Sequence, residues 1–297
     1  MRRTERRLWK GTVQTEMKQT KRIAVLGTEN SHARAFATLM RSCPDLKLIG
    51  AYGTESAANE RFEREFGVPC SSCPTDFVGK ADGIMITARD GRTHLTLAKP
   101  YLTTGMTLFV DKPLCATAGE TDELISLAKA NGVALSGGSC LRYAPSLLRL
   151  KSLADARRDE LVGASFSAPV EPDSPYGGFL FYAPHLAEMA LTVLGNGIRS
   201  VRAVRQGDHI TALLNYGDFC ASLFFGCDTY DASLSFRTGT VHGSVKNIPG
   251  LYTAEFAVFR SQLTGKQEPD FRGLGDHVRL CCAIRESYEN GTEVLFQ

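Results

Sequence analysis

Apolar segments of strand length alternate with segments of helical periodicity between residues 21 and 140. The predicted strands are Lys21–Gly27, Leu46–Tyr52, Gly83–Thr87, Thr107–Val110 and Val133–Ser136. The predicted helices between them are Ser31–Cys43, Glu55–Phe66, Thr93–Thr103 and Thr121–Ala130. Continuous apolar strands joined by helical crossovers are typical of a parallel sheet that is buried on both faces. We therefore predict a Rossmann-type, doubly wound α/β domain over residues 21–140, with a ligand crevice at the carboxyl ends of its strands.

The pattern changes after about residue 150 to short strands that alternate polar and apolar residues. These strands are Gly163–Val170, Ser200–Gln206, His209–Tyr216, Phe219–Phe225 and Ala232–Arg237, with helices at 184–194, 254–264 and 276–290. The turns Gly207-Asp208 and Gly217-Asp218 join three of the strands as hairpins. We predict a C-terminal α+β domain over residues 141–291 with a mainly antiparallel sheet. One face of this sheet packs on helices, and the other pairs with a second subunit in a homodimer or larger oligomer.

The two ends of the chain are expected to lie outside these domains. Residues 1–16 contain five basic side chains and no apolar run, so we interpret residues 1–20 as a disordered leader or an upstream start rather than a signal peptide or a nucleic-acid arm. Residues 292–297 resemble the remnant of a protease-cleavage tag. The net charge is only +2, which gives no electrostatic case for a nucleic-acid partner or a membrane surface.

The cysteines indicate a reducing compartment and no metal site. There are nine, an odd number, they are scattered, and no secretory signal accompanies them. We therefore expect free thiols in a cytoplasmic protein. Cys70 and Cys73 form a single CxxC without the second ligand pair that a structural zinc site needs, so no metal is predicted. A redox pair is the alternative interpretation of these two residues.

The loop after the first strand, residues 27–33, stands where a dinucleotide-binding fingerprint belongs. Gly27 supplies the glycine for the tight turn, but Glu29 occupies the place of the second glycine and His32 that of the third. The following helix still offers its free N–H groups to an anion. The second strand normally ends in an acid that holds the adenosine ribose, and Gly53 stands there. Either Glu55 reaches the ribose, or the missing acid admits a 2′-phosphate, for which no arginine is adjacent.

Asp111-Lys112-Pro113 follows the strand that ends at Val110. A lysine at the carboxyl end of a parallel strand points into the ligand crevice, where it serves as a hydrogen-bond donor or general acid. The proline fixes the backbone beside it, with a cis bond as one means of doing so. A surface lysine on a turn is the alternative interpretation.

The order of four motifs resembles the Gfo/Idh/MocA oxidoreductase family. Thr87-Ala88-Arg89 and His94 match the family's Thr-Pro-x-x-x-His segment, and Asp111-Lys112-Pro113 matches its Glu-Lys-Pro. Arg142-Tyr143-Ala144-Pro145 matches Arg-x-x-Pro. In the second domain, His185 matches the histidine of the catalytic pair, Glu188 takes the place of the later Asp, and Phe181 stands where the first Asp belongs.

The resemblance implies hydride exchange between NAD or NADP and a carbon that bears a hydroxyl, in a small polyhydroxylated substrate such as a sugar or cyclitol. Lys112 would hydrogen-bond the reacting oxygen, and His185 would exchange its proton with a pKa near the working pH. Arg142, Glu188 and Tyr182 would bind substrate. The residues expected at the cofactor are Gly27, Thr28, Asn30, Ser31, His32, Thr87, Arg89, His94, Asp111, Lys112 and Pro113.

Two other functions are compatible with the same residues. The cofactor could stay bound and be regenerated while oxidation permits elimination at a neighbouring carbon, as in a redox-assisted lyase. Alternatively, the chain could be a non-catalytic or regulatory ligand-binding protein on the same fold. Glu29 favours this last interpretation, whereas Lys112 and His185 oppose it.

Overall fold

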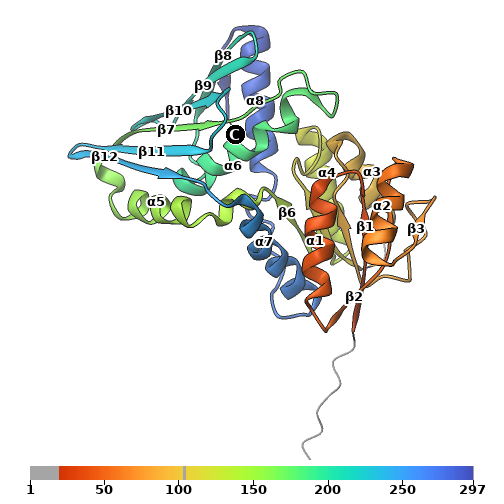
Figure 1. Cartoon of the computed structure of the whole chain (residues 1–297). Coiled ribbons are helices and arrows are strands. Elements are labelled where there is room, and N and C mark those ends of the chain that lie inside the picture. Colours follow the sequence, from red (N-terminus) through yellow and green to blue (C-terminus); the bar gives the residue numbers. More distant parts are fainter. Residues whose placement is uncertain (1–19, 103–104, 297) are drawn as a thin grey trace, which may run out of the picture.

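The computed structural model describes residues 20–102 and 105–296, which form two sheets with helices between and around them (Figure 1). The predicted leader therefore lies outside the described residues except for Thr20. No helix in the described part of the chain combines the length and the apolar character that a membrane span requires.

The first sheet is entirely parallel, and its strand order is β3-β2-β1-β4-β5-β6. Its strands are β1 Lys21–Leu26, β2 Leu46–Tyr52, β3 Cys70–Ser71, β4 Gly83–Ile86, β5 Thr107–Asp111 and β6 Leu135–Gly138. The helices between them are α1 Ser31–Arg41, α2 Ser56–Phe66, α3 His94–Leu102 and α4 Ala118–Ala130. The predicted doubly wound sheet is thereby confirmed. Because strand order reverses between β1 and β4, a crevice opens at their carboxyl ends.

The second sheet has the order β12-β11-β7-β10-β9-β8-β13, and only its β7–β10 pair is parallel. Its strands are β7 Leu161–Ala168, β8 Ser200–Gln206, β9 His209–Asn215, β10 Cys220–Phe225, β11 Asp231–Phe236, β12 Gly239–Ser244 and β13 Val294–Leu295. The mainly antiparallel sheet and both hairpins are confirmed. The alternation of buried and exposed residues along β8, β9 and β10 gives the sheet one covered face and one open face.

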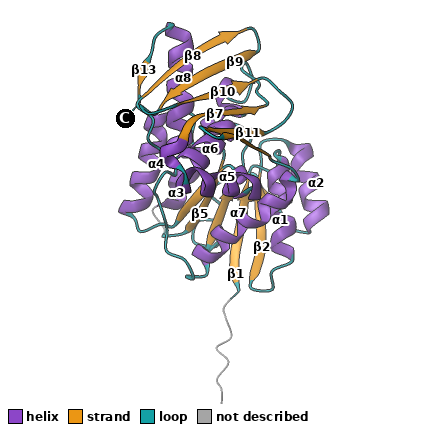
Figure 2. Cartoon of the chain, turned by 90° about the vertical axis from the view of Figure 1, so that its left-hand side faces the viewer, coloured by secondary structure: helices purple, strands orange, loops and turns teal. Residues whose placement is uncertain are grey.

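Three helices cover one face of this second sheet, as Figures 1 and 2 show: α5 Pro145–Ala156, α6 Ala183–Leu194 and α8 Asp276–Asn290. Helix α5 is absent from the sequence predictions. Its Pro145 occupies the first turn, where the missing N–H of a proline costs no hydrogen bond.

Helix α7, Ile248–Leu263, returns to the first sheet although it follows the second sheet in sequence. Phe256 and Phe259 lie in one apolar cluster with Phe36 of α1 and Phe109 of β5. The ring centroids of Phe109 and Phe259 are 6.4 Å apart, and those of Phe36 and Phe256 are also 6.4 Å apart. The predicted boundary at residue 140 therefore does not separate two independently packed cores.

The segment predicted to be a tag remnant takes part in the second sheet. Val294 and Leu295 pair with Val201 and Ser200 of β8, and the Phe296 N–H donates to the Arg199 carbonyl at 2.9 Å. These residues cannot be left out of the fold, contrary to the sequence-based expectation. The origin of the segment stays a prediction.

Candidate active site

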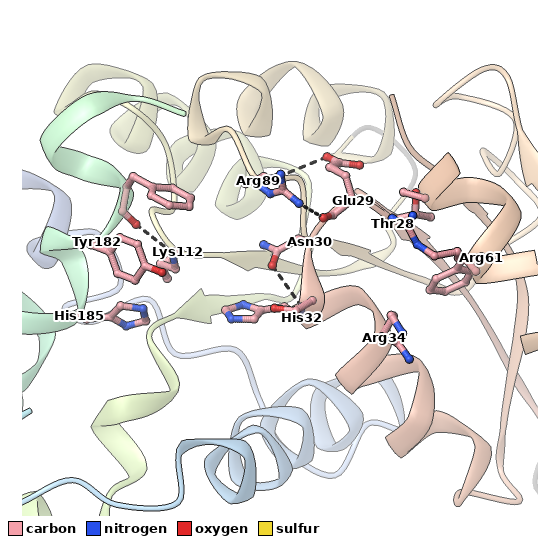
Figure 3. Close-up of a pocket in the computed structure, with 14 residues that line it drawn as sticks. Thr28, Glu29, Asn30, His32, Arg34, Arg61, Arg89, Lys112, Tyr182 and His185 are labelled. Atoms are coloured by element: carbon pink, nitrogen blue, oxygen red, sulfur yellow. Dashed lines mark hydrogen bonds between the residues drawn. The ribbon is translucent and has the colours of Figure 1, made fainter. Parts of the chain in front are cut away.

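A cavity of about 390 Å³ opens at the carboxyl end of the first sheet and extends to the start of α6 (Figure 3). Figure 3 shows Lys112, Tyr182 and His185 together at one end and Thr28, Arg34 and Arg61 at the other. Eight residues predicted for the site line this cavity: Thr28, Asn30, Ser31, His32, Arg89, Lys112, Tyr182 and His185. The fold thus brings together side chains from both predicted domains.

The loop between β1 and α1 packs closely against the backbone that follows β4. Gly27 has φ of +114°, and a Cβ there would lie 2.1 Å from the backbone nitrogen of Ala88, so only glycine fits. Asn30 caps α1, because its side chain accepts from the His32 N–H at 3.2 Å. The start of this helix, with its partial positive charge, borders the cavity at Ser31 and His32.

Glu29 lies in this loop at the position expected for the second glycine. Its Oε1 accepts from the Arg89 N–H at 3.4 Å, and its backbone carbonyl accepts from the Arg89 guanidinium. Its Oε2 is buried and has no hydrogen-bond partner within the described residues. The side chain is therefore held in one place and keeps one acceptor oxygen free for a donor.

Arg89 links three parts of the crevice. Its guanidinium donates to the Tyr176 hydroxyl at 2.9 Å, lies 4.9 Å over the Tyr176 ring, and is 3.7 Å from the Glu55 carboxylate. The sequence shows no arginine adjacent to Gly53, whereas the fold brings Arg89 to this region and places Arg34 and Arg61 on the cavity wall. These contacts join segments that are distant in sequence, so no local motif reveals them.

Lys112 stands at the end of β5 and is 7% exposed. Its Nζ donates to the Phe181 carbonyl at 2.9 Å and lies 4.6 Å over the Phe181 ring and 5.2 Å over the Tyr182 ring. Burial lowers the pKa of this ammonium, and the charge of Asp111 opposes that effect. The Lys112–Pro113 bond is cis. Lys112 is thus an oriented donor at the cavity rather than a surface lysine.

Asp111 is buried beneath the cavity and does not line it. It accepts from the Lys112 N–H at 2.7 Å and lies 2.5 Å from Nδ1 of His32, whose Nε2 is 2.8 Å from the Tyr252 hydroxyl. Burial raises the pKa of Asp111, but His32 and Lys112 outweigh it and hold the pKa below its ordinary value. A histidine at the third fingerprint position therefore serves to connect β5, α1 and α7.

His185 lies in the first turn of α6, with Nδ1 2.7 Å from the Ser139 hydroxyl. Burial lowers its pKa well below 6.5, and the charge of Lys112 adds to that effect. Both effects favour the neutral imidazole, so the structure does not support the expectation of a pKa near the working pH. Ser139 is absent from the sequence predictions, although it directly follows β6 at the same edge of the sheet.

Three residues predicted to contact the cofactor are buried behind the cavity. Thr87 Oγ1 donates to the Gly27 carbonyl at 3.1 Å. The two ring nitrogens of His94 are each 2.8 Å from a backbone carbonyl, one of Pro113 and one of Ala88. Thr87, His94 and Pro113 therefore hold the loops that border the cavity, and direct cofactor contact is not supported for them.

Arg142 and Glu188 border a different cavity of about 670 Å³ rather than the one that holds Lys112. Arg142 Nε donates to Glu188 Oε1 at 2.9 Å, and His277 Nδ1 lies 3.0 Å from Glu188 Oε2. Burial raises the pKa of Glu188, but Arg142 and His277 outweigh it and lower the pKa to about 2. This placement does not support substrate contact for either residue, and His277, to which the sequence assigns no role, completes the cluster.

Phe181 occupies the position where the resemblance expects an aspartate. Its ring packs against Tyr176 and Tyr182, with centroid distances of 5.4 Å and 4.9 Å. Its backbone carbonyl, rather than a carboxylate, accepts from Lys112. The polar contact to the lysine is thus supplied by the main chain, and the side chain forms an apolar wall. Within the described residues, no group of three or more His, Cys, Asp or Glu side chains is arranged to hold a metal ion.

Comparison with known proteins matches residues 21–139 to a family model described as an oxidoreductase family with an NAD-binding Rossmann fold. A curated relative, a putative UDP-kanosamine synthase oxidoreductase subunit of Amycolatopsis mediterranei, is 25% identical over 132 residues, 44% of this chain and 37% of that protein. A dTDP-3,4-didehydro-2,6-dideoxy-alpha-D-glucose 3-reductase of Streptomyces antibioticus is 26% identical over 180 residues, 59% of this chain and 53% of that protein. The matches thus span between about a third and about half of these relatives.

Solved structures match nearly the whole fold. A probable dehydrogenase from Thermotoga maritima gives a TM-score of 0.80 at 16% identity and covers 92% of this chain and 98% of its own. A myo-inositol 2-dehydrogenase from Lactobacillus plantarum gives 0.79 at 16% identity and covers 94% of this chain and 100% of its own. The scyllo-inositol dehydrogenase of Lactobacillus casei with bound NAD(H) and scyllo-inositol gives 0.77 at 17% identity, over 93% and 99%. At these identities the likeness confirms the predicted fold class.

Proposed function

We propose that the chain is an NAD(P)-dependent oxidoreductase of a small polyhydroxylated substrate, of sugar or cyclitol type, because residues 21–139 match the model of the Gfo/Idh/MocA oxidoreductase family. The observation that supports this most is that Lys112 and His185 line one cavity with the start of α1. Both side chains are buried, and both have defined polar partners. A donor and a proton acceptor beside an anion-binding helix end are what alcohol oxidation requires.

The residues of the crevice fit a dinucleotide. The N–H groups at the start of α1 suit a pyrophosphate, and Thr28, Asn30, Ser31 and Arg89 would surround it. Glu29 does not block this interpretation, because Arg89 fixes its side chain. When bound, the nicotinamide supplies the hydride exchange.

Lys112 and His185 have complementary roles in this proposal. The Lys112 ammonium donates to the oxygen of the reacting carbon and stabilises the negative charge that develops there. The neutral imidazole of His185 accepts the hydroxyl proton during oxidation. The Ser139 hydroxyl engages Nδ1, which leaves Nε2 for proton exchange. Phe181 and Tyr182 form the apolar wall that limits water at this end of the cavity.

The names of similar proteins support the proposed substrate class, and an exposed sheet face supports the proposed assembly. The names of the relatives refer to nucleotide sugars, and those of two structural neighbours to inositols. The open face of the second sheet supports a homodimer or larger oligomer. All nine cysteines are free thiols, which supports a cytoplasmic location.

The deciding experiment combines cofactor titration with a substrate screen. NADH and NADPH are titrated by nicotinamide fluorescence, and then inositols, hexoses and nucleotide sugars are screened with NAD⁺ and NADP⁺ at 340 nm. We expect micromolar binding and turnover with at least one polyol. Lys112→Ala and His185→Ala should each reduce turnover about 10²–10⁴-fold and change cofactor affinity little.

Each alternative function gives a different result. Substrate consumption without net NADH formation would identify a redox-assisted lyase. Ligand binding without turnover, unchanged by either alanine variant, would identify a non-catalytic protein. No binding of either dinucleotide, reduced or oxidised, would contradict the oxidoreductase proposal.

A further inference from the structure

The carboxyl end of β2 lacks the side chain that a dinucleotide-binding domain normally places there. Gly53 stands at the position of the ribose-binding acid. A Cβ at Gly53 would lie 2.0 Å from Thr28 Oγ1, 2.6 Å from Asn59 Oδ1 and 3.0 Å from Glu29 Oε2. The space that a residue 53 side chain would take is therefore already filled by three oxygens from other segments.

One of these oxygens belongs to the residue that replaces the second glycine of the fingerprint. Glu29 extends from the β1–α1 loop to the end of β2, and Arg89 holds its Oε1 and its backbone carbonyl. Its Oε2 faces the position of the missing side chain and has no hydrogen-bond partner in the described part of the chain. A buried carboxylate oxygen without a donor is costly, and a ligand hydroxyl at this place would remove that cost.

Glu29 also lies where two cavities meet. It lines the cavity of Lys112 and His185, and it lines a second one of about 490 Å³. The second cavity is bordered by Tyr52 and Thr54 at the end of β2 and by Ala88 after β4. An extended dinucleotide with its nicotinamide at Lys112 would place its adenosine half in this second cavity and its adenosine ribose beside Glu29. Figure 3 shows Glu29 and Arg89 next to each other between Lys112 and Thr28.

Resting on the proposed function, we propose that Glu29 takes over the task of the missing β2 acid. Its Oε2 accepts hydrogen bonds from the 2′- and 3′-hydroxyls of the adenosine ribose, and its charge repels a 2′-phosphate. The protein therefore prefers NAD to NADP. Glu55, the other acid near this site, has a side chain that is 48% exposed and already faces Arg89 at 3.7 Å. It is the matched control for Glu29.

The test measures binding rather than turnover. NADH and NADPH are titrated by fluorescence, and ADP-ribose by calorimetry, against the wild type, Glu29→Gln and Glu55→Gln. ADP-ribose carries the ribose hydroxyls but no nicotinamide, so an effect on it locates the contact in the adenosine half. Glutamine keeps the size of Glu29 and the acceptor for Arg89, and thermal unfolding verifies that each variant is folded.

We expect the wild type to prefer NADH to NADPH by at least about tenfold. Glu29→Gln should weaken the binding of NADH and of ADP-ribose about tenfold, which corresponds to the loss of one hydrogen bond to a charged group. It should not weaken the binding of NADPH. Glu55→Gln should change each affinity less than about twofold.

Three results would overturn the inference. The first is a wild type that prefers NADPH. The second is equally weakened binding of all three ligands by Glu29→Gln, and the third is a changed cofactor preference in Glu55→Gln alone. Each of them would leave the proposed oxidoreductase function standing. If none of the three ligands binds the wild type, the proposed function fails and this inference fails with it.

Discussion

The protonation of His185 has a direct kinetic consequence. Burial first, and then the charge of Lys112, lower its pKa well below 6.5, so the proton-accepting form persists as the pH falls through that value. We therefore expect kcat/KM for alcohol oxidation to stay level from pH 8 to pH 6.5 and to decline only below pH 6.5. A pH profile of the wild type measures this. An acidic limb centred at or above pH 6.5 would contradict the assignment of His185 as the base.

Glu188 is predicted to contribute stability rather than substrate contact. Its folded-state pKa of about 2 is below the ordinary value of 4.5, so its contribution is complete above pH 4.5 and is lost as the pH falls toward 2. Glu188→Gln leaves the Arg142 charge without its buried partner and should cost about 3–5 kcal/mol in urea unfolding at pH 7.

Asp155→Asn is the control for this variant, because Asp155 forms an exposed ion pair with Lys151 at 2.7 Å. Its expected cost is at most about 1 kcal/mol. An equal loss of unfolding free energy in the two variants would show that the buried Arg142–Glu188 pair stabilises the fold no more than an exposed ion pair does. If Glu188→Gln leaves the stability unchanged but raises KM, Glu188 binds substrate, as the sequence predicts.

At the scale of elements, α7 is expected to stabilise the sheet that precedes it by more than a hundred residues. Phe259 is fully buried against Phe109 of β5, so Phe259→Ala should cost about 3–5 kcal/mol. Hydrogen exchange should rise in β1 and β5 more than in β9. Leu148→Ala, on the exposed side of α5, is the control with a cost near zero. A small cost for Phe259→Ala would mean that α7 is only loosely attached.

The elements that the sequence predicts well are those with a strong hydrophobic period. The strands of the first sheet and the hairpins of the second carry such a signal. Strand β12, by contrast, is an exposed edge strand with few apolar residues, and β3 and β13 have two residues each. None of the three strands buries enough apolar surface to leave a pattern.

The candidate site divides in the same way. Lys112 and His185 belong to local motifs and are found from them. The partners that fix the site come from elsewhere in the chain: Ser139 is 46 residues from His185, and Tyr252 is 220 residues from His32. Their roles depend on tertiary contacts that no local spacing encodes. For the same reason the sequence alone associates Arg142 and Glu188 with substrate and does not show that they pair with each other.

At the scale of the whole molecule, the open face of the second sheet predicts self-association. Val204 of β8, Leu213 of β9 and Phe224 of β10 are 63%, 47% and 39% exposed and lie on adjacent strands. Light scattering should therefore give at least a dimer at micromolar concentration. Leu213→Asp should shift the protein toward monomer. Val78→Asp places the same charge on an exposed apolar position of the first domain and should not. A wild-type monomer would contradict the prediction.

The return of α7 to the first sheet also dictates an order of events during synthesis. When residues 20–140 have left the ribosome, all strands of the first sheet have been synthesised. The helix that covers the apolar surface around Phe36 and Phe109 has not. That surface stays uncovered until residues 248–263 have been translated. A nascent chain of this length is therefore expected to expose an aggregation-prone apolar surface. The same surface makes the isolated N-terminal segment a poor candidate for separate expression, because it would be left to bind other copies of itself.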